Sequence, residues 1–216
     1  MIFYRPTDGD PHTGIIQYRP RTSFIMTKLG TPIPKEVNRI RSNLRKIITD
    51  YGINLIDAND VVTGKDFLLK IWHIILGVPL GIAIITNEMS HKTIANIFYE
   101  IGLMQAYGKE TLVIKTENID MPSDFVRTEY IDFGRGFKKK ITKYLKKFLT
   151  LASDYEFMSE QVEKNPLLAI DYLKRAWLIS GENAYCQKAR EIFQEAAIEG
   201  RAKNSVEMLL VDFCKE

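Results

Sequence analysis

Three polar side chains in one stretch of the sequence are spaced so that they could act together on a ligand. Asn96, Tyr99 and Glu100 follow a strongly apolar run at residues 79–86 and lie in a segment of helical period. Residues three and four apart share one face of a helix, so an amide, a phenol and a carboxylate should be presented together. A carboxylate that is partly desolvated near a helix start could act as a nucleophile, stabilise a sugar cation or accept ribose hydroxyls. The alternative is structural: Glu100 is a solvated helix residue and Asn96 completes a cap for Thr93.

Other polar residues near this segment are weaker candidates. His91 could protonate a leaving base, because imidazole exchanges protons near neutral pH, or it could be an exposed loop residue. Asp57 and Asp60 follow the second predicted strand, where they could hold ribose hydroxyls or cap the next loop. The sequence shows no histidine, cysteine or acid cluster at metal-ligand spacing, so we expect neither a metal site nor a bound cofactor.

The composition is that of a folded globular protein. Hydrophobic residues make up 45% and charged residues 26% of the 216 positions, and the net charge is +3. So small an excess does not favour nucleic acid as the partner, although it leaves that partner possible. Only two cysteines are present, Cys186 and Cys214, which we expect to be buried thiols. The sequence shows neither a secretory pattern at its start nor a membrane span, so we expect a cytoplasmic protein that does not bind membranes.

Basic charge is concentrated in one predicted helix. Residues 137–151 contain six lysines on the polar side of an amphipathic pattern. The usual meaning is a solvated outer helix. The alternative is a patch that attracts RNA, DNA or an acidic protein.

From Thr22 onward, short apolar runs alternate with segments of helical period, which is typical of an α/β protein with a parallel sheet. The pattern predicts strands at residues 22–27, 53–56, 79–86, 111–115 and 129–133. It predicts helices at residues 35–51, 65–76, 93–107 and 137–151. We therefore expect a doubly wound, flavodoxin-like sheet of five mainly parallel strands, in which ligands bind at the carboxyl ends of the strands.

The sequence divides into residues 1–21, expected to be an extended arm or a strand added at a sheet edge, an α/β domain at 22–151, and a helical extension at 152–216. We expect the α/β domain to be the nucleotide-binding and catalytic one. The extension has one junction similar to that of a tetratricopeptide repeat. Ile170, Leu173 and Trp177 lie on one stripe and should be buried. We expect this extension to pack on the α/β domain, on a second copy of the chain in a homo-oligomer, or on a partner protein.

Three blocks of the sequence resemble those of one superfamily. Phe24-Ile25-Met26 with Gly30 is similar to its opening strand and loop, and Pro122-Ser123-Asp124 before Tyr130 is similar to a later segment. The middle block, Asn96-Ile97-Phe98-Tyr99-Glu100-Ile101-Gly102, is the most specific of the three. The family is the nucleoside 2-deoxyribosyltransferase-like and TIR-like domain superfamily.

This resemblance implies an enzyme that cleaves the N-glycosidic bond of a nucleoside, a nucleotide or NAD, by hydrolysis or by transfer of the sugar. Glu100 matches the catalytic glutamate of the family. The resemblance also implies a set of substrate-binding residues: Phe24, Met26, Gly30, Asn87, Asn96, Tyr99 and Asp124. It implies no metal, and antiviral defence is a setting in which such domains serve.

The chain departs from the family at one place that matters for chemistry. The family often has an acidic residue directly after the third strand, where this chain has Thr86-Asn87, and the loop up to the helix is longer. The alternative function is therefore a non-catalytic nucleotide-binding or protein-interaction module, in which the 87–93 loop has lost the chemistry and the helical extension recruits a partner.

Overall fold

The structure is a computed structural model, described for residues 4–6, 8–10, 16–60, 67–117, 119–121, 129–196 and 200–213. Its five strands are β1 (Thr22–Met26), β2 (Asn54–Ile56), β3 (Leu80–Ile85), β4 (Glu110–Lys115) and β5 (Glu129–Asp132). They form one sheet in the order β2-β1-β3-β4-β5, and every neighbouring pair is parallel. The predicted five-stranded α/β fold is confirmed, and the five predicted strands agree with those of the structure to within one residue at each end.

The two central strands, β1 and β3, lie in the middle of the core, with both of their faces shielded from water. All five residues of β1 and all six of β3 are buried. β1 and β3 pair from Ser23 with Leu80 to Met26 with Ala83. A Cβ atom at Gly81 would lie 2.8 Å from the Cε atoms of Met26 and Met104, so a side chain there would force the ends of these two methionines to move.

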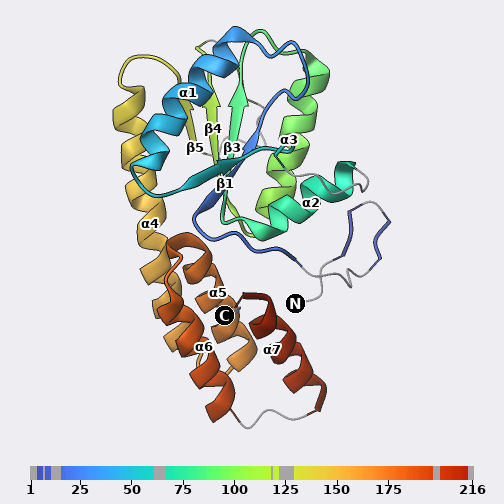
Figure 1. Ribbon diagram of the computed structural model, residues 1–216, viewed down its shortest axis with the longest axis vertical. Coiled ribbons are helices and arrows are strands. Elements are labelled where there is room, and N and C mark those ends of the chain that lie inside the picture. The colour runs from blue at the N-terminus through green and yellow to red at the C-terminus, as the bar shows by residue number, and fades with distance from the viewer. Residues whose placement is uncertain are drawn as a thin grey trace.

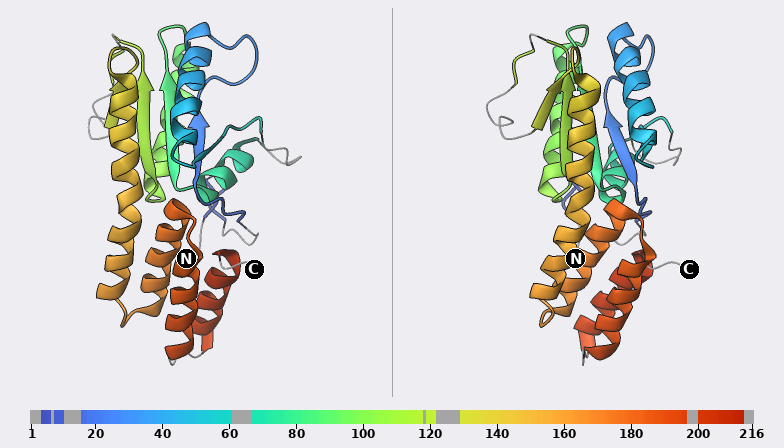
Figure 2. Two further views of the ribbon diagram at one scale, coloured as in Figure 1. Left: turned by 60° about the vertical axis from the view of Figure 1, so that its left-hand side comes forward. Right: turned by 90° about the vertical axis from the view of Figure 1, so that its left-hand side faces the viewer.

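Helices cover both faces of the sheet (Figures 1 and 2). α1 (Lys35–Thr49) and α4 (Phe137–Gln161) lie together on one face. α2 (Phe67–Gly77) and α3 (His91–Ala106) lie on the other, where α3 packs on β1, β3 and β4. This two-sided cover explains why the central strands are almost continuously apolar rather than alternating.

The helical extension shares the core of the sheet. It comprises the second half of α4, then α5 (Pro166–Ser180), α6 (Asn183–Glu195) and α7 (Gly200–Phe213). The predicted end of a helix at residue 151 is wrong, because α4 continues to Gln161, burying Ala152 and Ser159 against the extension. Ile170 and Leu173 are buried, as predicted, in the same hydrophobic cluster as the sheet. Trp177 is only partly buried, with its ring edge-on to that of Tyr18, at 6.5 Å between centroids.

Two further findings concern the predicted absence of a membrane span and the predicted state of the two cysteines. None of the described helices is both long and apolar enough to cross a membrane. Cys186 is partly exposed and disulfide-bonded, so the prediction of a buried thiol is wrong there, while Cys214 lies outside the described residues.

Arg21 joins three parts of the chain at the amino end of the sheet. Its side chain donates hydrogen bonds to the carbonyl oxygens of Tyr51, of Gly52 at 3.0 Å and of Ser180 at 3.2 Å. Its backbone N–H donates to the carbonyl oxygen of Leu178 at 2.8 Å. Arg21 has a φ of 51°, a conformation that non-glycine residues seldom adopt. The contacts that hold it there link the arm and β2 to α5.

A buried group of charges lies at the same junction. Lys109 donates to the carbonyl oxygen of Leu76 at 3.0 Å, and burial, together with Lys174 and Arg175, lowers its pKa to about 7. Asp171 pairs with Lys174 at 2.9 Å and with Arg175 at 3.1 Å. Burial by itself would raise the pKa of Asp171, but these two cations lower it below its ordinary value. The extension is therefore joined to the α/β domain by polar contacts as well as by the shared core.

Arg21→Ala should destabilise the protein by about 2 kcal/mol in total. One hydrogen bond from a charged donor is worth about 1.5 to 3 kcal/mol, but the three acceptors here are exposed or only partly buried, so water replaces part of the loss. Urea unfolding measures the free energy. Arg19→Ala is the matched control, since the Arg19 side chain donates to exposed Gln17 at 2.8 Å. Equal losses in the two variants would contradict the linking role of Arg21.

Candidate functional site

The strand order creates one place where a ligand crevice is expected. The connections leave β1 and β3 in opposite directions, because β2 lies on one side of this central pair and β4 on the other. At such a reversal the loops after the two strands diverge, and ligands of open α/β sheets bind between them. Here those loops are residues 27–34 after β1 and residues 86–90 after β3.

The loop after β1 is held by its own contacts. The Thr27 hydroxyl donates to the carbonyl oxygen of Ile84 at 3.4 Å, which ties the loop to β3. Lys28 donates through Nζ to the carbonyl oxygens of Pro32 at 2.6 Å and Gly30 at 3.4 Å. Gly30 is exposed, with a φ of 75° that favours glycine. The structure thus places Gly30 at the surface of the expected crevice.

Two other predicted binding residues lie beneath this loop. Phe24 is 1% exposed and Met26 is fully buried. Their side chains belong to the core, so they support the crevice from below rather than line its surface.

The loop after β3 is fixed to the end of β4. The Asn87 backbone N–H donates to the Thr116 hydroxyl at 3.3 Å, and its side-chain amide donates to the carbonyl oxygen of Glu117 at 3.3 Å. Thr86 is fully buried, and its hydroxyl has no hydrogen-bond partner in the described part of the chain. The last of the predicted binding residues, Asp124, lies outside the described residues.

α3 begins earlier than its sequence period indicates. Ser90 caps the helix by accepting a hydrogen bond from the Thr93 N–H at 3.2 Å, so the helix starts at His91, which is exposed. The alternative that Asn96 completes this cap is wrong. Glu100 is nine residues beyond His91, about 14 Å along the axis at 1.5 Å per residue. It therefore lies in mid-helix, and the expectation of a carboxylate near the helix start is wrong.

The environment of Glu100 is unusual for a helix carboxylate. The residue is half-buried beside Ile97, Ile101 and Met104, which are all buried. Burial raises its pKa to about 7, and no ion pair or hydrogen bond from the described residues offsets this effect. A carboxylate that is partly removed from water without compensation costs free energy, and such groups are concentrated at functional sites.

Asn96 and Tyr99 accompany Glu100 on α3 as the spacing predicts. Both are exposed, and the Tyr99 side chain is 47% exposed. The exposed amide of Asn96 and the exposed phenol of Tyr99 therefore lie beside the half-buried carboxylate of Glu100. This polar edge of α3 can donate to, and accept from, the hydroxyls of a sugar while Glu100 supplies charge.

Asp57 and Asp60 serve the structure instead. Asp57 is buried, pairs with Arg41 and accepts a hydrogen bond from the Asn59 N–H at 2.7 Å. Asp60 accepts from the Asp57 N–H at 2.7 Å. The structure thus favours the loop-capping alternative for this pair.

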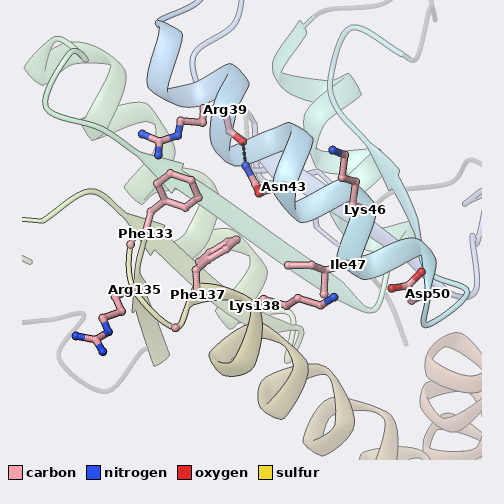
Figure 3. A pocket seen from close by; sticks show the side chains of 11 residues that line it. Arg39, Asn43, Lys46, Ile47, Asp50, Phe133, Arg135, Phe137 and Lys138 are labelled. Carbon is pink, nitrogen blue, oxygen red and sulfur yellow. Dashed lines mark hydrogen bonds between the residues drawn. The ribbon is translucent and has the colours of Figure 1, made fainter.

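A second candidate site, which the sequence reasoning missed, lies on the α1 and α4 face. We call it the α1–α4 groove: a cavity of about 650 Å³ between α1 and the turn from β5 into α4 (Figure 3). Its lining includes Arg39, Lys46, Phe133, Phe137 and Lys138. A neighbouring hollow of about 490 Å³ shares Arg39 and Phe133 and reaches Asn87. Glu100 lines neither cavity, and the second hollow lies between the groove and the loop after β3.

The sequence does contain one feature that could have pointed to this groove. Phe133 and Phe137 flank the Gly134-Arg135-Gly136 turn, and the lysine-rich helix starts there. Arg39 is an exposed residue of α1, and only the fold brings it beside that turn.

Comparison with known proteins adds no relative. Searches of protein-family models, curated proteins and solved structures found no match to this chain. The resemblance to the deoxyribosyltransferase-like and TIR-like superfamily therefore depends on the three sequence blocks. In the described ranges, no three histidine, cysteine, aspartate or glutamate side chains are grouped so that they could hold a metal ion.

Glu100→Gln should stabilise the protein at alkaline pH. The pKa of Glu100 is raised from 4.5 to about 7 in the folded state, so the folded protein binds more protons than the unfolded chain between these values. Wild-type stability should then fall as pH rises through this window, by about 2 to 3 kcal/mol. The variant lacks this fall. Urea unfolding at about pH 4.5 and about pH 8 measures it.

The control for this experiment is Glu163→Gln, which removes an exposed carboxyl between α4 and α5. It should leave the pH dependence unchanged. If Glu100→Gln has the same pH dependence as wild type, Glu100 is not held in an unfavourable environment.

Proposed function

We propose that this protein is an enzyme that cleaves the N-glycosidic bond of a nucleoside, a nucleotide or NAD, by hydrolysis or by transfer of the sugar. Glu100 is its catalytic residue in this proposal. The observation that carries it is the half-buried Glu100 carboxylate without a described partner, in the block that resembles the catalytic block of the superfamily.

The chemistry requires a negative charge near the anomeric carbon. As the bond from C1′ to the base nitrogen breaks, its electron pair leaves with the base and positive charge develops on the sugar. A carboxylate can stabilise that charge or form a bond to C1′, giving a glycosyl ester that water or a second base then attacks. The base of an ordinary nucleoside or nucleotide leaves as an anion and takes up a proton from solvent, whereas the nicotinamide of NAD leaves as a neutral molecule and needs none. No metal is needed for any of these steps.

The raised pKa suits this role. A carboxylate that has lost part of its hydration interacts strongly with a nearby positive charge, because solvent screens it less. In the empty site the charge is unfavourable. A sugar that becomes positive in the transition state would supply the missing partner, so the site would bind the transition state better than the substrate.

Other residues would position the ligand. Asn96 and Tyr99 border Glu100 and would hold hydroxyls of the sugar. Gly30 and Asn87 lie on the two loops where the strand order reverses, which is the usual place for the rest of a nucleotide.

The helical extension fits a role in assembly. Phe157, Met158, Leu167 and Leu168 on α4 and α5 are large apolar side chains exposed between 38% and 61%. We infer that they contact a second copy of the chain or a partner protein, and that an antiviral defence effector is one setting for such an assembly.

A non-catalytic nucleotide-binding module is the second candidate function. One observation favours it: the cavities on the α1 and α4 face are not lined by Glu100. In that case the protein would bind its ligand without turning it over, and Glu100 substitutions would leave ligand affinity unchanged.

Incubation of the purified protein with NAD and a panel of nucleosides and nucleotides, followed by chromatography, tests the proposal. We expect release of a free base from at least one substrate. Glu100→Gln should reduce the rate at least about a hundredfold, or about 3 to 4 kcal/mol, because it removes the charge while keeping the volume. Binding of the substrate should weaken only modestly.

Asn96→Ala is the comparison variant, since it removes a positioning group and should cost less activity than Glu100→Gln. If wild type turns over a substrate and the Gln variant does so equally fast, Glu100 is not catalytic. If wild type binds nucleotides but releases no base from any of them, the non-catalytic alternative is correct.

The pH dependence of kcat/KM gives a separate prediction. The reaction needs ionised Glu100, and the pKa of this group is about 7. kcat/KM should therefore rise as pH rises from about 5.5 and level off above about 8, with a midpoint near the pKa of the free enzyme. A rate that falls over this range would mean that the protonated form acts, and would contradict a carboxylate role.

A further inference from the structure

The α1–α4 groove is rimmed by cations. Lys46, Arg135 and Lys138 are exposed, and none of them forms an ion pair with an acid in the part of the chain that the structure describes. Arg39 lies 3.4 Å from Glu36 in a surface ion pair, which water and salt weaken. Asp50 is the one acid that lines this cavity, so the rim is positive on the side of Lys46, Arg135 and Lys138. The neighbouring hollow beyond Arg39 and Phe133 carries Glu36, Glu88 and Glu117.

The floor of the groove is aromatic and apolar. The rings of Phe133 and Phe137 lie edge to face, with centroids 4.9 Å apart. The Arg39 guanidinium lies over the Phe133 ring, 5.3 Å from its centroid. Figure 3 shows both rings between α1 and the start of α4. A half-buried ring and a guanidinium plane are surfaces on which a nucleic-acid base can stack.

The positive charge continues along α4 beyond the groove. The five further lysines of this helix are all exposed, namely Lys139, Lys140, Lys143, Lys146 and Lys147. No acidic residue occurs between residues 137 and 153. Lys138 and Lys146 lie within a quarter turn of each other on the helix and about 12 Å apart along its axis, which exceeds the reach of a single phosphate group. Lys147 lies half a turn from Lys138, near Glu110. An extended polyanion fits this distribution better than a mononucleotide.

We propose that the α1–α4 groove binds a single strand of nucleic acid. The cations at the rim and along α4 contact its phosphates, and Phe133 with Arg39 provides the surface for an unpaired base. A single strand is favoured over a duplex because its bases are free to stack on protein rings. The net charge of +3 concealed this possibility, because the rest of the chain balances the basic face.

Glu100 does not line this site, which does not depend on the proposed N-glycosidic activity. Strand binding can therefore succeed or fail whether or not the protein turns over a nucleotide.

Fluorescence anisotropy with a labelled single-stranded oligonucleotide of about 12 nucleotides, at about 50 mM salt, tests the proposal on the full chain. We expect saturable binding that weakens steeply with added salt. Arg135→Glu with Lys138→Glu should weaken it at least about tenfold, because two phosphate contacts become repulsive. Phe133→Leu should weaken it severalfold while preserving an apolar floor, because leucine has no ring on which a base can stack.

The matched control is Lys164→Glu with Lys203→Glu, which makes the same change in net charge at exposed positions on the extension. It should leave binding within about twofold of wild type. If both double variants weaken binding equally, net charge alone explains the effect, and the groove is not the binding site.

Three other results would also overturn the proposal. One is the absence of binding to the strand. Another is equal affinity for a mononucleotide, which would mean a small-ligand site. The third is preference for a duplex with no effect of Phe133→Leu, which would mean backbone attraction without stacking.

Discussion

The exclusion of water from both faces of β1 and β3 is the constraint on which the rest of the structure depends. Every residue of both strands is buried, and β3 carries no polar side chain, so helices must cover the sheet on both sides. α3 meets that requirement by packing on β1, β3 and β4, and Gly81 allows Met104 of α3 to approach closely. The same packing brings Glu100 partly out of water. The candidate catalytic charge is therefore a consequence of how the core is closed.

Much of the fold could be predicted because the central strand β3 is a continuous apolar run, the other strands are short segments with apolar residues, and the helices of the α/β domain alternate with them. Boundaries were harder where no residue type marks them. The α4 helix continues past residue 151 since neither glycine nor proline interrupts it before Pro166, and its packing on α5 replaces its packing on the sheet. At α3 a single hydroxyl, that of Ser90, moves the start of the helix to His91.

The candidate site could be predicted only in part. The spacing of Asn96, Tyr99 and Glu100 fixes their shared helix face, but the depth of Glu100 depends on the strands below it. The α1–α4 groove could not be predicted from local pattern, because Arg39 and Phe133 are distant in the sequence and meet only when α1 and the turn before α4 lie on one face of the sheet. Local pattern thus identifies charge and period, whereas burial and concavity come from packing.

The account depends most on the state of the Glu100 carboxylate. Burying this carboxylate without a described partner lowers the free energy of unfolding, which is not expected of a residue with a purely structural role. A positively charged transition state would supply the missing partner. The most direct measurement is a carbon-13 NMR titration of glutamate carboxyl groups, with the Glu100 signal assigned by its loss in Glu100→Gln. The account predicts a titration midpoint near pH 7 for this carboxyl. A midpoint near 4.5, the ordinary value of a glutamate in water, would contradict it.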